Sequence, residues 1–172
     1  MTDIRLSEHF LLSEFTRSST AERLGIDNSL DASNPLDQDV INNLRNLCEE
    51  ILEPLRAFAG QPIIIGSGFR CPALNKAVGG VKNSQHMTGE ACDIRLPRTP
   101  YVDWGDNLAH TDMSVAYRWL DFLEHHTDFD HYQNLNLIKS RVCGKYSTDC
   151  VSREVLIIMF DNNICSHEQR PA

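Results

Sequence analysis

The residues best suited to chemistry lie in one stretch, SGFRCPALNKAVGGVKNSQHMTGEACDIRL, which runs from 67 to 96. It contains Arg70, His86 and, seven positions after that histidine, Asp93. A histidine and a carboxylate can be two ligands of a catalytic zinc ion, which takes three protein ligands and leaves a fourth position for water. The spacing alone is weak support, because most lone histidines are surface residues or hydrogen-bonded core residues. Zinc ligation and a structural histidine are both compatible with these residue types.

The segments before this stretch predict helices. Apolar residues from 37 to 58 recur at helical spacing, which predicts an amphipathic helix whose last turn Pro54 should kink or shorten. A shorter helix, with Ser13 as its N-cap, should run through residues 16–24 and end at Gly25.

Short apolar runs predict strands at 63–65, 90–96 and 155–160, and helical spacing returns at 113–123. Within the second strand, Asp93 should share a face with Ala91, since side chains alternate along a strand. Gly89 would permit the sharp turn that precedes this strand. The small residues Gly89 and Ala91 would also keep the approach to a metal open.

Length and charge limit the classes of function. A chain of 172 residues, 41% of them hydrophobic, can form one domain with its own core. Its formal net charge is −8, and it has no run rich in lysine and arginine, so binding to nucleic acid or an anionic membrane is disfavoured. No apolar segment approaches the roughly 20 residues of a membrane span, and no secretory signal is recognisable at the N-terminus. We therefore expect a soluble protein that is cytoplasmic as synthesised.

The six cysteines have irregular spacing and form no CxxC pair of the kind used by structural zinc sites. We expect reduced thiols, several of them buried as small hydrophobic side chains.

Several motifs follow one another in a specific order: LSEHFLLSEF at 6–15, ILEPLR at 51–56, SGFR at 67–70, PxLN at 72–75 and SxHxxGxAxD at 84–93. In this order and spacing they resemble the zinc D-alanyl-D-alanine carboxypeptidases and their phage endolysin relatives. The resemblance covers roughly residues 6–96.

The resemblance implies a fold and several site residues. The fold would be a small α+β domain with a central antiparallel sheet and helices packed on it, of the D-Ala-D-Ala carboxypeptidase/Hedgehog-like type. His86 and Asp93 match the first two zinc ligands. Arg70 matches the arginine that pairs with substrate or with the developing oxyanion, although a structural salt bridge is the alternative. Ser84 matches a serine that hydrogen-bonds the substrate, the alternative being a loop cap.

The third zinc ligand is less clear, because the family's Trp-x-His-x-Ser pattern is missing after Asp93. In the family an acid three residues before that histidine acts as the general base, and Asp128 with His131 reproduces this spacing. Alternatively, Cys150 could replace the histidine as a thiolate ligand, but Ser147 would then stand where the base is needed. A third alternative is that there is no third ligand and the protein does not catalyse.

The resemblance implies a zinc metallopeptidase that cleaves peptidoglycan stem peptides, of the D-Ala-D-Ala carboxypeptidase or the L-Ala-D-Glu endopeptidase type. Asp128 would be the general base, and His131 would complete the metal site. The alternative is a catalytically silent member of the family that binds peptidoglycan or a protein. We expect one domain over residues 1–172, with a core at about 6–160, a flexible tail and a monomer as the default. A phage lysin would reach the cell wall on release by lysis.

Overall fold

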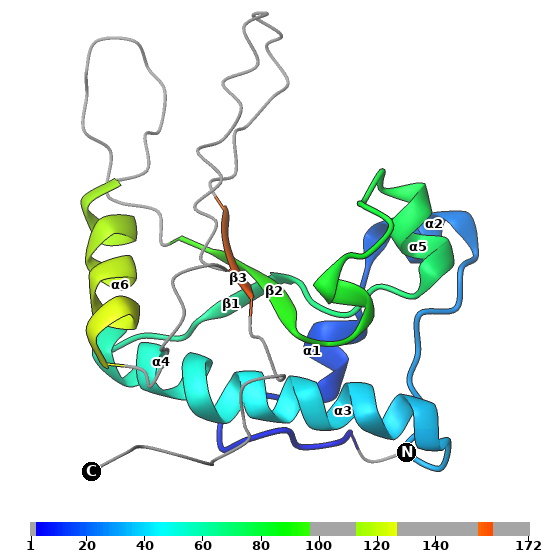
Figure 1. The fold of residues 1–172 in the computed structure, drawn as a ribbon, viewed down its shortest axis with the longest axis horizontal. Helices are drawn as coiled ribbons and strands as arrows, with labels where there is room; N and C mark the ends of the chain where they lie inside the picture. The colour runs from blue at the N-terminus through cyan, green and yellow to red at the C-terminus, as the bar shows by residue number, and fades with distance from the viewer. Residues whose placement is uncertain (1–2, 97–112, 127–154, 160–172) are drawn as a thin grey trace, which may run out of the picture.

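Three strands form one antiparallel sheet that packs against helices. In the computed structural model, which describes residues 3–96, 113–126 and 155–159, the strand order is β1-β2-β3. The strands are β1 (Ile64–Ser67), β2 (Ala91–Arg95) and β3 (Val155–Met159). The middle strand, β2, runs antiparallel to both neighbours (Figure 1). The predicted α+β class with a central antiparallel sheet is confirmed.

A long helical segment supports this sheet. Helix α3 (Pro35–Leu47) continues through the π-helical turn η1 (Cys48–Leu52) into α4 (Glu53–Ala59), and the three run below the sheet in Figure 1. Pro54 accounts for the wide turn, because proline has no N–H to donate and its ring would collide with the carbonyl four residues earlier. The N–H of Glu53 donates instead to the oxygen of Cys48. The kink expected at Pro54 therefore takes the form of a π-helical turn just before it.

The N-terminal segment forms two helices, α1 (Leu12–Thr16) and α2 (Ser19–Leu24). The single helix expected to start from a cap at Ser13 is therefore wrong. Arg17 has an extended backbone, and the Ser18 side chain accepts a hydrogen bond from the N–H of Ala21, so Ser18 caps a new helix. Gly25 ends α2 with a φ of 65°, as predicted.

The hydrophobic core lies between the helical segment and one face of the sheet. Leu44, Leu47 and Leu55 of the long segment are 0% exposed, and so are Cys92 and Ile94 of β2. Because strand side chains alternate, Asp93 points to the opposite face, away from the helices. Because the core occupies one face of β2, the functional side chain Asp93 lies on the opposite face.

A β-bulge in β1 decides where Ser67 points. Ile65 pairs with Ile94, but the register then shifts, and Ser67 pairs with Asp93. Strict alternation would send Ser67 into the core after Ile65, whereas the extra residue, Gly66, turns it to the face that carries Asp93. The bulge therefore brings a hydroxyl group next to the carboxylate of the central strand.

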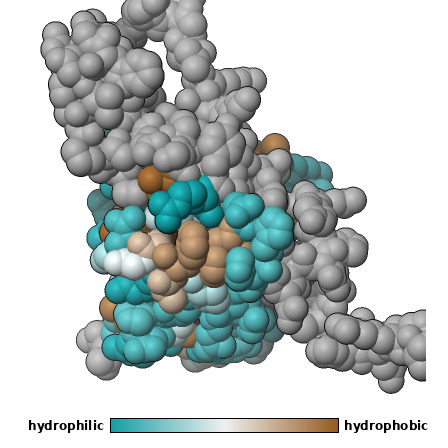
Figure 2. Space-filling view, turned by 90° about the vertical axis from the view of Figure 1, so that its left-hand side faces the viewer, coloured by the Kyte–Doolittle hydropathy of each residue, from teal (hydrophilic) through white to brown (hydrophobic). Residues whose placement is uncertain are grey.

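Helix α6 (Met113–His126) packs beside α4. Trp119 and Leu123 enter the core, while Phe122 stacks on Phe58 of α4 with ring centroids 4.2 Å apart. The face seen in Figure 2 shows apolar side chains among hydrophilic ones. Phe58 of α4 is 42% exposed. Among the described helices, none is long and apolar enough to cross a membrane.

The described cysteines agree with the expectation of free thiols. Cys48, Cys71 and Cys92 are unpaired, and Cys48 and Cys92 are buried. Burial raises the pKa of both buried thiols well above the ordinary value, so they remain protonated at neutral pH. They act as small apolar side chains in the core.

The long helical segment should tolerate truncation only on its outer face. We expect Leu47→Ala to lower the free energy of unfolding by about 2–5 kcal/mol, because it leaves a cavity at a position that is 0% exposed. Leu36→Ala on the same helix is the matched control, since Leu36 is 76% exposed, and it should change stability by less than about 0.5 kcal/mol. Urea denaturation followed by circular dichroism measures both. Equal effects of the two changes would contradict this placement of the core.

Candidate functional site

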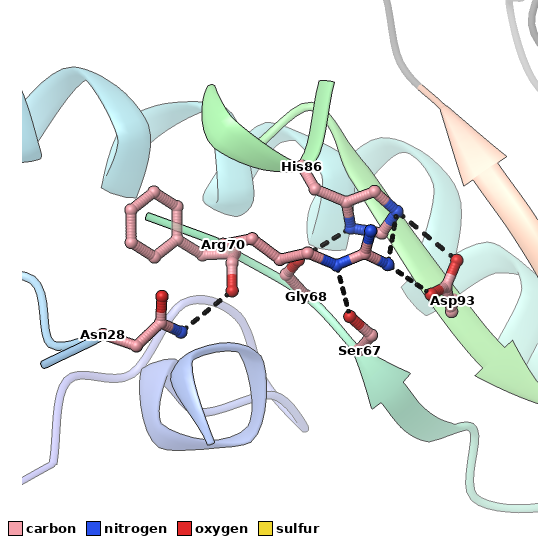
Figure 3. Close-up of polar contacts among 7 residues, drawn as sticks. Asn28, Ser67, Gly68, Arg70, His86 and Asp93 are labelled. Atoms are coloured by element: carbon pink, nitrogen blue, oxygen red, sulfur yellow. Dashed lines mark hydrogen bonds and ion pairs between the residues drawn. The ribbon is translucent and has the colours of Figure 1, made fainter. Parts of the chain in front are cut away.

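The ring of His86 is held in one orientation beside the sheet. His86 belongs to the short 3₁₀ helix η2 (Gln85–Met87), and only 5% of the residue is exposed. Its Nδ1 lies 2.7 Å from the carbonyl oxygen of Gly68 (Figure 3). A carbonyl oxygen only accepts hydrogen bonds, so Nδ1 carries the hydrogen, and in the neutral ring Nε2 carries the lone pair. The nitrogen available to bind a metal therefore points toward Asp93.

The Asp93 carboxylate has one satisfied oxygen and one that lacks a hydrogen bond. Oδ2 accepts a hydrogen bond of 2.8 Å from Nη2 of Arg70, and this contact is also an ion pair. Oδ1 is buried, has no hydrogen-bond partner, and lies 3.4 Å from Nε2 of His86. A buried carboxylate oxygen without a partner is costly, so its position calls for a positively charged neighbour.

This pair of atoms fits a zinc ion. Two ligand atoms bound at about 2.0–2.2 Å in tetrahedral geometry lie roughly 3.3–3.5 Å apart. The separation of 3.4 Å between His86 Nε2 and Asp93 Oδ1 falls in this range. Nitrogen of a neutral imidazole and oxygen of a carboxylate are also ligand types that zinc prefers. The unpartnered oxygen and the lone pair that faces it make a suitable two-ligand half of a metal site.

Arg70 lies directly beside these two atoms and connects the loop after β1 to the histidine. Its Nε donates to Ser67 Oγ at 3.0 Å, and its Nη2 lies 3.2 Å from His86 Nε2 (Figure 3). The backbone N–H of Arg70 also donates to the carbonyl oxygen of His86 at 3.0 Å. The salt bridge expected as an alternative role of Arg70 is therefore present, on Asp93 itself. The guanidinium of Arg70 therefore contacts both His86 and Asp93.

Asn28 fixes the backbone on both sides of Arg70, and sequence reasoning missed it. Its Nδ2 donates to the carbonyl oxygens of Thr16 at 2.9 Å and Phe69 at 3.0 Å, and its Oδ1 accepts from the N–H of Cys71 at 2.7 Å. Asn28 is 6% exposed. It comes from the polar segment after α2, where we assigned no role to any residue. The sequence marks that segment only as a turn, and the partners of Asn28 are distant in the chain.

Glycines allow two close approaches that place the site. A Cβ on Gly68 would lie 2.6 Å from Cα of Phe15, so only a residue without a side chain can pack this closely against α1. Gly68 is also the residue whose carbonyl oxygen accepts the hydrogen bond from His86. Gly89 has a φ of 77°, which supports the predicted turn, but a Cβ there would lie 2.6 Å from the carbonyl oxygen of Val40. Gly89 therefore faces α3, and its small size serves helix packing rather than access to a metal.

Ser84 occupies the N-cap position of η2 but makes no side-chain capping hydrogen bond. Its carbonyl oxygen accepts from the N–H of Met87 at 2.9 Å. The contact of Ser84 with substrate stays a prediction.

Asp128, His131 and Cys150 lie outside the described residues. Within the described part of the chain, no group of three or more His, Cys, Asp or Glu side chains could hold a metal ion.

Comparison with known proteins supports the resemblance drawn from the motifs. The sequence model of the family described as Peptidase M15 matches residues 8–127. No curated protein sequence matches the chain. The family match covers more than half of the chain and includes Arg70, His86 and Asp93.

Asn28→Ala should destabilise the protein and loosen the Arg70 loop. It removes the partners of two carbonyl oxygens and of one buried N–H, which should lower the free energy of unfolding by about 2–4 kcal/mol. Asn42→Ala is the matched control, because Asn42 is an exposed amide on α3, and it should cost less than about 0.5 kcal/mol. Urea denaturation measures both, and amide hydrogen exchange at Cys71 reports the loop. Unchanged protection of Cys71 in Asn28→Ala would contradict the role given to Asn28.

Proposed function

The chain belongs to the peptidase M15 family, and from this premise we propose that it is a zinc-dependent peptidase that cleaves the stem peptides of peptidoglycan. Membership in the family makes it a peptidase with a peptide as substrate. The finer assignment, to a D-Ala-D-Ala carboxypeptidase or an L-Ala-D-Glu endopeptidase, rests on the motifs around Arg70, His86 and Asp93. We further propose that the peptidase domain spans the whole chain, with a core at about residues 6–160.

One observation carries the proposal of zinc. Asp93 Oδ1 is buried without a hydrogen-bond partner and lies 3.4 Å from the lone-pair nitrogen of His86. Two acceptor atoms at this distance have no hydrogen to share when the imidazole is neutral. Nε2 has a donor in Nη2 of Arg70 at 3.2 Å, whereas Oδ1 has none, and a cation bound between the two atoms would satisfy Oδ1. We propose His86 and Asp93 as the first two metal ligands on this ground.

The third ligand is proposed to be His131. A catalytic zinc takes three protein ligands, and the described residues supply two of them in this arrangement. A further protein ligand would therefore come from outside the described ranges. Asp128 lies three residues before His131, which is the spacing of the general base in the family. The residue three positions before Cys150 is Ser147, which cannot accept a proton from water at neutral pH.

Each residue has a role that follows from its chemistry. A bound zinc ion would act as a Lewis acid on the scissile carbonyl and make a water molecule acidic enough to attack it near neutral pH. Asp128 would accept the proton from that water. Arg70 would stabilise the negative charge that develops on the carbonyl oxygen, since its guanidinium already lies 3.2 Å from His86 Nε2. Ser84 would hydrogen-bond the backbone of the peptide.

The orientation of Arg70 also supports this assignment. Ser67 and Asp93 occupy its Nε and Nη2 donors, and the backbone bond to His86 fixes the base of the side chain. A donor that is already held in place does not reorganise when charge develops during the reaction. Nη2 also contacts His86 Nε2, and these three side-chain contacts leave Nη1 without a partner among the described residues, so its hydrogens can face the substrate.

The test is metal content together with cleavage of cell-wall peptides. Wild-type protein should contain one zinc ion per chain by mass spectrometry of the metal and should release stem-peptide fragments from purified sacculi. His86→Ala and Asp93→Asn should each lose the zinc and the activity, because each removes a ligand. His9→Ala is the matched control, since His9 pairs with Glu53 away from the site, and it should retain both.

The alternative outcomes separate enzyme from binding module. Zinc-free wild-type protein that still binds sacculi would contradict the peptidase and favour the silent binding module. A zinc content that is unchanged in Asp93→Asn would contradict the proposed ligand pair even if the protein cleaves peptides. Circular dichroism of each variant checks that the fold is retained.

A further inference from the structure

A cleft of about 460 Å³ is lined by three arginines, while His86 and Asp93 are not among its lining residues. The cleft is linked to Asp93 by Arg70, which bonds its carboxylate, and by Ser67, which pairs with it in the sheet; Arg17 and Arg95 are the other two arginines. We call this site, defined by Arg17, Arg70 and Arg95, the arginine cleft. Its volume is within the range of about 300–1,000 Å³ that small-molecule sites occupy.

The two outer arginines reach the cleft through irregularities of the fold. Arg17 lies at the break between α1 and α2, where the backbone is extended. Arg95 ends β2 on the outer face of the sheet, two residues from Asp93. A Cβ on Gly66 would lie 3.6 Å from Cγ and 3.8 Å from Nε of Arg95, so the arginine side chain lies across the bulge glycine. The side chain of Arg95 therefore lies beside the bulge that turns Ser67 to the outer face.

The charges of Arg17 and Arg95 are not neutralised by fixed partners among the described residues. Arg70 is engaged by Ser67 and Asp93, but within the described residues no hydrogen bond or ion pair joins Arg17 or Arg95 to another group. Both are exposed at the cleft. Two glutamates, Glu14 and Glu22, also line the cleft, and Glu14 is occupied by the N–H of Leu11. Because Arg70 is paired with Asp93, the positive charges of the cleft that lack a fixed partner are those of Arg17 and Arg95.

This arrangement suits a carboxylate. A guanidinium group presents paired N–H donors that match the two oxygens of a carboxylate, and such bonds are stronger than those between neutral groups. The lining residue Arg70 also bonds Asp93, so one side chain joins the cleft to the proposed metal pair.

We propose that the arginine cleft is a substrate subsite in which Arg17 and Arg95 bind a carboxylate of the peptide close to the scissile bond. This proposal rests on the proposed function of the same site. It adds that the site selects peptides that carry a negatively charged carboxylate at this position. Arg17 and Arg95 act as specificity-determining residues, while Arg70 keeps its proposed role of stabilising the charge on the carbonyl oxygen. A stem peptide offers this carboxylate from two sources, its C-terminus or the free α-carboxylate of a γ-linked D-glutamate.

The experiment compares three peptides that differ only in charge. The parent is N-acetyl-L-Ala-γ-D-Glu-L-Lys-D-Ala-D-Ala, and its two derivatives carry a primary amide either at the glutamate α-carboxyl or at the C-terminus. Binding to the full-length protein is measured by calorimetry with EDTA present, so that cleavage does not interfere, and kcat/KM is measured with zinc. In wild-type protein one of the two amides should bind about ten- to a hundredfold more weakly than the parent, and that amide identifies the source of the carboxylate.

Charge-removing variants then assign the effect to the two arginines. In Arg17→Gln and Arg95→Gln, and most clearly in the double variant, the preference for the parent over that amide should shrink to about twofold or less. Binding of the amide itself should stay within about twofold of wild type, which shows that the cleft is intact. Arg23→Gln is the matched control, because Arg23 is an exposed arginine of α2 outside the cleft, and it should keep the full preference.

The outcomes distinguish this proposal from the proposed function. Equal binding of all three peptides by wild-type protein would overturn the subsite, whether or not the protein cleaves them. Loss of parent and amide binding by the same factor in the arginine variants would also overturn it. A preference for the carboxylate that depends on Arg17 and Arg95 would support the subsite even if no peptide is cleaved, and in that case only the peptidase assignment fails.

Discussion

Two acceptor atoms, Nε2 of His86 and Oδ1 of Asp93, face each other at 3.4 Å in a largely buried place, and the surrounding structure is arranged around this contact. Such a pair needs positive charge nearby, because a buried carboxylate oxygen without a partner is costly. Arg70 supplies part of that charge through the other carboxylate oxygen. The hydrogen bond from Nδ1 to Gly68 keeps the histidine from turning away, so the contact is built into the fold rather than adopted on binding.

The backbone that carries these groups is fixed by contacts between segments distant in sequence. Gly68 packs so tightly on Phe15 that a methyl group would not fit, which sets the distance between the first helix and the end of β1. Asn28 then ties the peptide groups on both sides of Arg70 to the segment after α2. Because the N-terminal segment is bonded to the arginine loop, it belongs to the site even though it supplies none of the proposed metal ligands.

The sequence predicts the regular elements better than their junctions. Periodic apolar residues found the long helical segment and the three strands, since burial dictates those patterns. The motifs placed Arg70, His86 and Asp93 together, and the structure brings them together. The π-helical turn before Pro54, the break at Arg17 and the bulge at Gly66 were not foreseen, because each depends on hydrogen bonds that compete locally with the regular pattern. Asn28 was missed because its partners are 12, 41 and 43 residues away.

These unforeseen junctions are where selectivity for substrate can be placed without disturbing the metal pair. His86 and Asp93 depend on the core, since β2 is packed on one face by buried side chains and η2 is tied to Gly68. Arg17 and Arg95 sit instead at a helix break and at the end of a strand, are exposed, and have no fixed partner among the described residues. A change at either position alters the charge of the cleft and little of the packing. Of the three arginines, only Arg70 both lines the cleft and bonds Asp93, so its replacement would disturb the charge of the cleft and the carboxylate together. If the proposed subsite is correct, the fold separates the two arginines that select the substrate from the arginine that is bonded to the proposed metal ligands.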